Sequence, residues 1–214
     1  TAGAAGRLRP GLAAAGFAGL ALIAAALPGC GPAGAQVPQA EAAPVALRLE
    51  THPITSFSRL WGSARVGDLE FLGGLELSAS APDFGGLSGI ATADRGRDLL
   101  MITDGGFWVS GRLDTAEDGT PKSLSAVTMA DMHEVSGKAL IDKRDADTES
   151  LAIRRTPDGL EAIVGFEARH RILRFPFAGP GLSGALASKG QPLPDAPKDI
   201  RSLRYTKGLE AIAA

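Results

Sequence analysis

Residues 147–153 read DTESLAI and place two carboxylates directly before a short apolar run. A polar residue ahead of a similar run recurs at residues 87–91 (LSGIA) and 209–213 (LEAIA). The aligned positions are evenly spaced, because 149 − 88 = 61 and 210 − 149 = 61; they hold Ser88, Glu149 and Glu210. Equal spacing of a short motif indicates a repeat architecture.

The residues around each motif predict antiparallel strands. Apolar runs at residues 99–102 and 160–164 follow the turn sequences DRGR (94–97) and TPDG (156–159), and a third run occupies residues 171–175. Short apolar runs separated by such turns are typical of hairpins. Residues 114–121 and 179–197 are the predicted long loops. The predicted fold is therefore all-β, a β-propeller of antiparallel four-stranded blades, with one extended loop in each repeat unit.

In a propeller the innermost strand of each blade lines a central channel. Carboxylates repeated at the start of that strand converge and repel one another unless a cation neutralises them. Oxygen ligands favour Ca²⁺, so Glu149 and Glu210, with Asp147, are the predicted metal ligands. Asp104 and Glu167 hold similar offsets from their repeat marks, since 104 − 88 = 16 and 167 − 149 = 18, and are predicted to face the same mouth. The alternative is that the acidic residues only cap loops or pair with arginines on the channel wall.

Several short motifs follow one another along the chain: residues 84–90 (FGGLSGI), 102–106 (ITDGG), 147–152 (DTESLA), 165–167 (GFE), 171–175 (RILRF) and 207–213 (KGLEAIA). Taken in order, they resemble the phytase-like family described as "esterase-like activity of phytase". The resemblance covers roughly residue 71 to the last residue, and the family is similar to β-propeller phytases, which bind Ca²⁺ and hydrolyse phosphate monoesters. It therefore implies a propeller, Ca²⁺ and a small anionic substrate such as a phosphate ester. Where the family usually reads Ser-Asp-Arg-Gly, residues 103–106 read TDGG.

Other polar residues offer further candidates for chemistry. Arg171, with Arg169 and His170, is suited to holding an anion beside Asp104 and Glu167, because arginine binds phosphate in a bidentate way. The alternative is a hairpin turn with solvated charges. Ser88 is not in a nucleophile elbow, because Gly89 follows it immediately. His133 could be a base or a metal ligand, but we expect a surface loop residue, since no second histidine keeps metal-ligand spacing with it.

The first 35 residues resemble a lipoprotein-type signal peptide rather than part of the fold. Arg7 and Arg9 precede an Ala-rich apolar run, and the sequence LPGC ends at Cys30, the predicted lipidation site. Residues 33–35 (AGA) offer ordinary signal cleavage as a second possibility, and a retained membrane anchor is a third. Residues 36–44 predict a flexible linker, and residues 45–214 the phytase-like domain. The predicted location is the periplasm or cell envelope, with membrane contact only through the lipid anchor.

Charge and length restrict the class of function. The formal charge is −2, and removing Arg7 and Arg9 with the signal makes it 20 − 24 = −4. A nucleic-acid partner is not expected, because no basic surface is indicated. The chain holds about two units and the start of a third, whereas a propeller needs at least four blades. We therefore expect a domain truncated at its C-terminus, and a monomer when full length.

Two functional hypotheses follow. The first is an exported metal-dependent hydrolase of phosphate or other esters, with Asp147, Glu149 and Glu210 holding the metal. Its predicted catalytic residues are Asp104 and Glu167, which would complete the metal shell or act as base, and Arg171. The second is a non-catalytic, membrane-tethered propeller that binds a ligand or a protein. The substrate is not predicted by either.

Overall fold

The computed structural model describes residues 43–56, 65–179, 181–205 and 207–214, all within the unit Ala40–Ala214. Cys30, the predicted signal peptide and residues 36–42 of the predicted linker lie outside the described residues. In the described ranges, no helix has both the length and the apolar character that a membrane-spanning helix requires.

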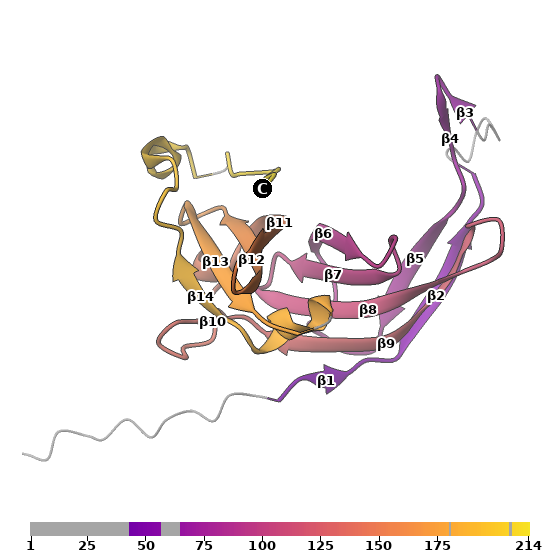
Figure 1. Cartoon of the computed structure of the whole chain (residues 1–214), viewed down its shortest axis with the longest axis horizontal. Helices are drawn as coiled ribbons and strands as arrows, with labels where there is room; N and C mark the ends of the chain where they lie inside the picture. The colour runs from indigo at the N-terminus through magenta and orange to yellow at the C-terminus, as the bar shows by residue number, and fades with distance from the viewer. Residues whose placement is uncertain (1–42, 57–64, 180, 206) are drawn as a thin grey trace, which may run out of the picture. The chain divides into compact units, whose positions relative to one another are not determined.

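Two five-stranded sheets follow one another along the chain (Figure 1). In the first, four consecutive strands form an antiparallel meander, and β1 (Val45–Ala46) pairs antiparallel along its far edge. The meander consists of β6 (Leu87–Ala93), β7 (Asp98–Thr103), β8 (Phe107–Thr115) and β9 (Pro121–Asp131).

The second sheet repeats this arrangement. Its antiparallel meander carries β10 (His133–Glu134) at the far edge, where β10 runs parallel to the last strand. The short helix α1 (Lys143–Ala146) precedes the meander, and the 3-10 helices η1 (Leu182–Ala187) and η2 (Lys198–Ser202) flank its last strand in sequence. The strands are β11 (Thr148–Thr156), β12 (Gly159–Phe166), β13 (Arg171–Phe177) and β14 (Lys189–Pro192).

Two smaller sheets complete the described part of the chain. β2 (Leu49–Ile54) pairs with β5 (Gly74–Ala79), and β3 (Arg65–Val66) pairs with β4 (Leu69–Glu70).

The repeat step found in the sequence corresponds to an equivalent backbone position in the two meanders. The β6–β7 register shifts between Leu87 and Gly89, and the β11–β12 register shifts between Thr148 and Ser150. Ser88 and Glu149 are thus the extra residues of two β-bulges at the start of two first strands. A bulge changes the direction in which a side chain points. The equivalent bulges therefore set the directions of the Ser88 and Glu149 side chains in their two strands.

The main core lies between the two meanders. It includes Leu100 and Ile102 of β7 and Ala162 and Val164 of β12, and Trp108 meets Phe175 edge-on with ring centroids 5.0 Å apart. Side chains on a strand alternate between its faces. Met101 accordingly belongs to a second cluster on the other face of the first sheet, and Ile163 to a third on the other face of the second. Both meanders are therefore covered on both faces, which accounts for the nearly continuous apolar runs of β7 and β12.

The all-β prediction is confirmed, whereas the propeller stays a prediction, because the described residues form no closed sheet. The predicted loop at residues 114–121 connects β8 to β9. The predicted loop at residues 179–197 is wrong, since it contains η1 and β14. The surface position expected for His133 is also wrong: His133 lies in β10 and is buried, because β14 pairs beside it.

Candidate metal-binding site

The site begins where α1 passes into β11. Asp142 caps α1 by accepting a hydrogen bond from the Arg144 backbone N–H, and Asp147 follows the last helical turn. The Asp147 carbonyl then accepts a hydrogen bond from the Glu167 N–H at 2.8 Å. This bond extends the β11–β12 pairing by one step and brings the residue after β12 beside the residue before β11.

Three carboxylates gather at this point. One oxygen from each of Asp147, Glu149 and Glu167 lies within 4.8 Å of the others. Asp147 and Glu167 lie next to the backbone pairing, and Glu149 is the bulged residue of β11. Sequence reasoning placed Asp147 and Glu149 in the metal set and Glu167 at the same mouth, and the structure brings these three together.

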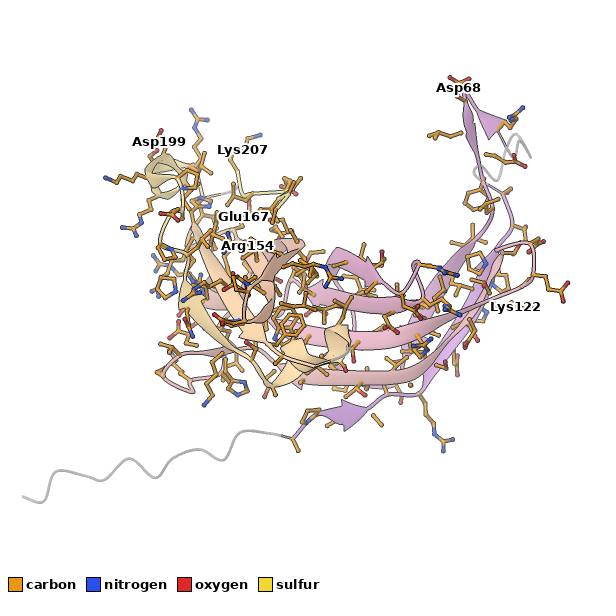
Figure 2. All side chains as sticks on the ribbon, viewed as in Figure 1. Asp68, Lys122, Arg154, Glu167, Asp199 and Lys207 are labelled. Carbon is orange, nitrogen blue, oxygen red and sulfur yellow. The ribbon has the colours of Figure 1, made fainter. Side chains whose placement is uncertain are left out.

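Glu210 approaches the cluster from the C-terminal segment. Gly208 donates its N–H to Glu167 Oε1 at 2.9 Å, and Leu209 and Ile212 pack against the third apolar cluster. Figure 2 shows Glu167 and Lys207 on the same side of the second sheet. The segment that carries the third motif therefore lies beside the second meander, although it forms no assigned strand.

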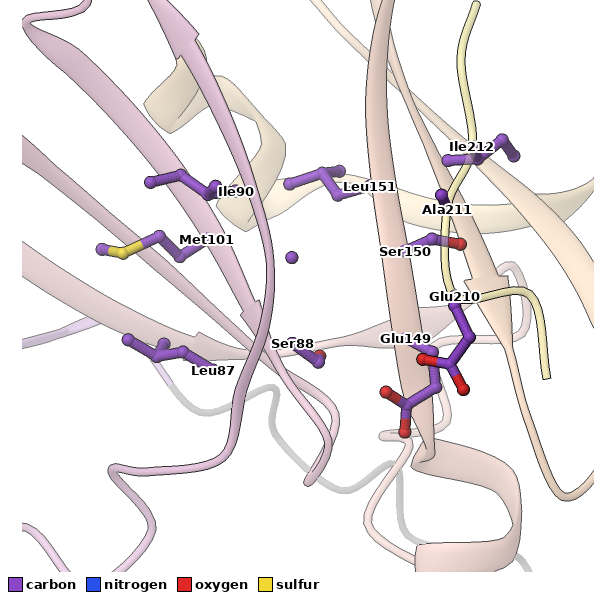
Figure 3. A pocket seen from close by; sticks show the side chains of 11 residues that line it. Leu87, Ser88, Ile90, Met101, Glu149, Ser150, Leu151, Glu210, Ala211 and Ile212 are labelled. Carbon is purple, nitrogen blue, oxygen red and sulfur yellow. The ribbon is translucent and has the colours of Figure 1, made fainter. Parts of the chain in front are cut away.

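A cavity of about 460 Å³ opens beside Glu149 and Glu210. Figure 3 shows these two carboxylates together at one end, while Ile90, Met101 and Leu151 line another part. Ser150 also lines the cavity, and its buried hydroxyl has no hydrogen-bond partner within the described ranges.

The surroundings of Glu149 disfavour its ionised form. Its pKa is raised to about 7, first by burial and then by the negative charges of Asp147, Glu167 and Glu210. A cation bound beside Glu149 would stabilise its ionised form, and the displaced proton would be released to solvent.

Lys143 is a site residue that sequence reasoning missed. Its Nζ donates to Asp147 Oδ1 at 2.6 Å, to Asp104 Oδ2 at 2.9 Å and to the Asp104 carbonyl at 3.0 Å. Partial burial acts to lower the pKa of Lys143, but the hydrogen bonds and charges of Asp147 and Asp104 together outweigh it and raise this pKa. The only sequence signal was that Lys143 stands four residues before Asp147, which places both on one helical face.

Asp104 lies outside the three-carboxylate cluster and is connected to it by Lys143. Its backbone N–H donates to the Gly86 carbonyl at 2.9 Å, just as Glu167 donates to Asp147. The predicted equivalence of Asp104 and Glu167 therefore corresponds to an equivalent backbone hydrogen bond. About half of the Asp104 side chain is exposed to solvent.

Arg171 is engaged within the chain. Its guanidinium donates to the Asp145 carbonyl at 2.5 Å and to the Arg169 carbonyl at 3.1 Å, and it stacks 3.9 Å from the Phe166 ring centroid. It lines a cavity different from the one beside Glu149 and Glu210. The turn 167–170 carries Arg169, whose Nη1 lies 2.9 Å from Asp145 Oδ1, so its charge is paired although the side chain is largely exposed to solvent. The catalytic role predicted for Arg171 stays a prediction.

The described residues thus define an all-β protein built from two equivalent meanders, with an all-oxygen acidic site where the second begins. The phytase-like family model, described as esterase-like activity of phytase, matches residues 82–214. This match covers more than half of the chain, and the chain therefore belongs to the phytase-like family. No curated protein and no solved structure matches the chain.

Proposed function

We propose that the protein is an exported, metal-dependent hydrolase of phosphate or other esters. The observation that carries this proposal is the convergence of Asp147, Glu149 and Glu167 within 4.8 Å of one another. Membership of the phytase-like family supports the reaction class.

The donor set fits a hard cation such as Ca²⁺. All candidate ligands are carboxylate oxygens, the type that Ca²⁺ binds, and the pKa of Glu149 is raised first by burial and then by the neighbouring negative charges, which a cation would offset. Asp147, Glu149 and Glu167 would hold the ion, with Glu210 beside them. When bound, Ca²⁺ supplies charge neutralisation for a phosphoryl group and acidifies a bound water.

The protein's own side chains have separate roles at this site. Glu167 Oε1 accepts the Gly208 N–H, and Asp147 Oδ1 accepts from Lys143, which leaves one oxygen of each carboxylate for a ligand. Asp104, with its exposed carboxylate, is the candidate to accept a proton from an attacking water. Lys143 donates hydrogen bonds to both Asp104 and Asp147 and so holds these two carboxylates near each other.

We also propose that the two meanders are blades of a propeller. The bulge repeated at Ser88 and Glu149, the packing of β6 beside β11, and the C-terminal segment lying along the second meander support this arrangement. In it, Ser88, Glu149 and Glu210 begin successive inner strands.

The test is phosphate release from phytate and from a simple aryl phosphate by the purified protein, with Ca²⁺ and then with chelator. We expect Ca²⁺-dependent release that chelator abolishes. Glu149→Gln should lower the rate at least tenfold and remove the rise in melting temperature caused by Ca²⁺. Glu117→Gln, an exposed carboxylate in the β8–β9 loop, serves as the matched control and should behave like the wild type.

Release that is insensitive to both chelator and Glu149→Gln would contradict the metal assignment. If Ca²⁺ raises the melting temperature but no ester is hydrolysed, the non-catalytic propeller becomes the better description.

Export is proposed from the N-terminal sequence, with Cys30 as the lipidated residue. Metabolic labelling with a radioactive fatty acid should mark the wild type and not Cys30→Ala. Labelling of both proteins, or of neither, would contradict a lipid anchor at this position.

A further inference from the structure

A second cavity, of about 540 Å³, lies at the turn between β12 and β13 and shares no lining residue with the cavity beside Glu149. Three parts of the chain that are distant in sequence meet there: α1, this turn, and the segment that begins in η2. Their polar side chains in the lining are Arg144, Arg169, His170, Arg171, Arg201 and Tyr205.

The turn and the C-terminal segment are held together by a specific contact. His170 Nε2 lies 2.9 Å from the Arg204 carbonyl, and since a carbonyl only accepts, Nε2 carries the proton. This bond fixes the segment with Arg201 and Tyr205 across from the turn. The cavity wall is thus built by tertiary contacts rather than by one loop.

The charge of this cavity is strongly positive. Four guanidinium groups line it, and among the described residues no carboxylate does. Asp145 pairs with Arg169, and Asp145 and Glu134 act electrostatically on Arg171, so two negative charges offset four positive ones. A concentration of like charge is unfavourable unless an anion accompanies it, and the whole chain is slightly acidic.

The arginines differ in how firmly they are held. Arg171 is fixed by two backbone carbonyls and Arg169 by Asp145. Arg144 and Arg201 are exposed, and within the described ranges their guanidinium groups have no ion pair or hydrogen bond. By contrast, Arg112 and Arg174 each pair with a carboxylate. Two guanidinium groups held by protein contacts and two without such contacts therefore line one cavity, and the second pair has donors free for a ligand.

We propose that this arginine pocket, defined by Arg144, Arg169, Arg171 and Arg201, binds a phosphate group. Planar guanidinium groups bind the oxygens of phosphate in a bidentate way, and Tyr205 adds a hydroxyl donor. The ligand is either inorganic phosphate or the phosphate of a larger ester. The pocket does not depend on the metal site, and its binding does not require hydrolysis.

The test is a calorimetric titration of the purified protein with inorganic phosphate, in buffer stripped of metal by a chelating resin. A soluble chelator is avoided because it is itself an anion. Ionic strength is held constant, so that general screening is the same in every titration. We expect wild-type binding that the double variant Arg144→Gln/Arg201→Gln weakens at least tenfold.

Arg155→Gln is the matched control, because Arg155 is exposed and lines neither this pocket nor the cavity beside Glu149. It should bind phosphate like the wild type. Since Arg144 and Arg201 are exposed, the double variant should keep the wild-type melting temperature. No binding by the wild type, or equal binding by the double variant, would overturn the proposal.

A parallel titration with an aryl phosphate distinguishes the two sources of the ligand. Tighter binding of inorganic phosphate identifies a site for the free ion, and tighter binding of the aryl phosphate identifies a site for the ester. Because no metal is present, failure of this proposal and failure of the metal-dependent hydrolysis are separate results.

Discussion

The two meanders share a backbone frame but differ in chemistry. Each begins with a bulge at the same point of its first strand, and in each the residue after the second strand donates its N–H to the residue before the first. In the first meander the corresponding positions hold Gly86, Ser88 and Asp104, and in the second they hold Asp147, Glu149 and Glu167.

The difference follows from what each side chain can do. Ser88 donates its hydroxyl proton to the Thr148 carbonyl at 2.6 Å and so connects the two meanders. An ionised glutamate at the same position has no proton to donate, and Glu149 instead faces other carboxylates. Gly86 has no side chain, and a Cβ there would collide with Asp104 Oδ1. One frame thus supports a structural contact in one meander and an acidic site in the next.

The largest expected effect comes from breaking the packing between the meanders. Trp108→Ala removes a fully buried ring that meets Phe175 of the second meander. We expect the free energy of unfolding to fall by about 3–5 kcal/mol, measured by urea denaturation. Trp108→Phe, which keeps a ring, should lose clearly less. Equal losses for both variants would show that the ring contact does not join the two meanders.

A second variant makes the first meander more like the second. Gly86→Asp introduces a side chain where φ is +56° and where Asp104 already fills the space. We expect a loss of about 1–3 kcal/mol from backbone strain alone, with a further loss from the close approach. Gly96→Asp, at φ +85° with open space around it, isolates the strain. If both variants lose the same amount in urea denaturation, the close approach has no effect.

A smaller effect is expected from Ser88→Ala, which removes the hydrogen bond to the Thr148 carbonyl. A bond of this kind contributes about 1 kcal/mol, and thermal unfolding measures the loss. Ser202→Ala removes an exposed local bond to the Asp199 carbonyl and should cost less. A Ser88→Ala variant as stable as wild type would assign no stabilising role to this link.

The smallest effect concerns pH, because solvent screens the partly exposed Glu149. Its pKa rises from 4.5 in the unfolded chain to about 7 in the fold, so between these values the folded state binds more protons. Without metal, stability should therefore decrease as pH rises from about 4.5 to about 7 and then level off. Glu149→Gln should lack this component. Parallel stability curves for the two proteins across this window would contradict the assignment.

The repeated strand arrangement could be predicted from the sequence because the signals for it are local. The equal steps between Ser88, Glu149 and Glu210 mark equivalent positions, and the turns at residues 94–97 and 156–159 connect hairpin strands as predicted. The carboxylates Asp147 and Glu149 were predictable for the same reason, since both belong to the repeated motif.

The remaining features depend on tertiary contacts. β14 (KGQP) has no apolar alternation and forms because β13 and β10 pair with it. Lys143 contacts Asp147, four residues away, but its second carboxylate partner is Asp104, which is distant in sequence. Arg171 could be proposed as an anion ligand from its residue type, whereas its contacts with Asp145 and Phe166 depend on the tertiary fold.

The sequence positions of the edge strands β1 and β10 determine the order in which the two sheets can be completed during synthesis. β1 is made before the sheet that it completes, so the first sheet has all its strands once Asp131 has left the ribosome. β10 must instead wait for its pairing partner Lys189, which is made only after α1 and the strands β11 to β13. A ribosome paused within this interval would hold a finished first sheet and a β10 that is paired only through its bridge to Ala139, and the second sheet would form last.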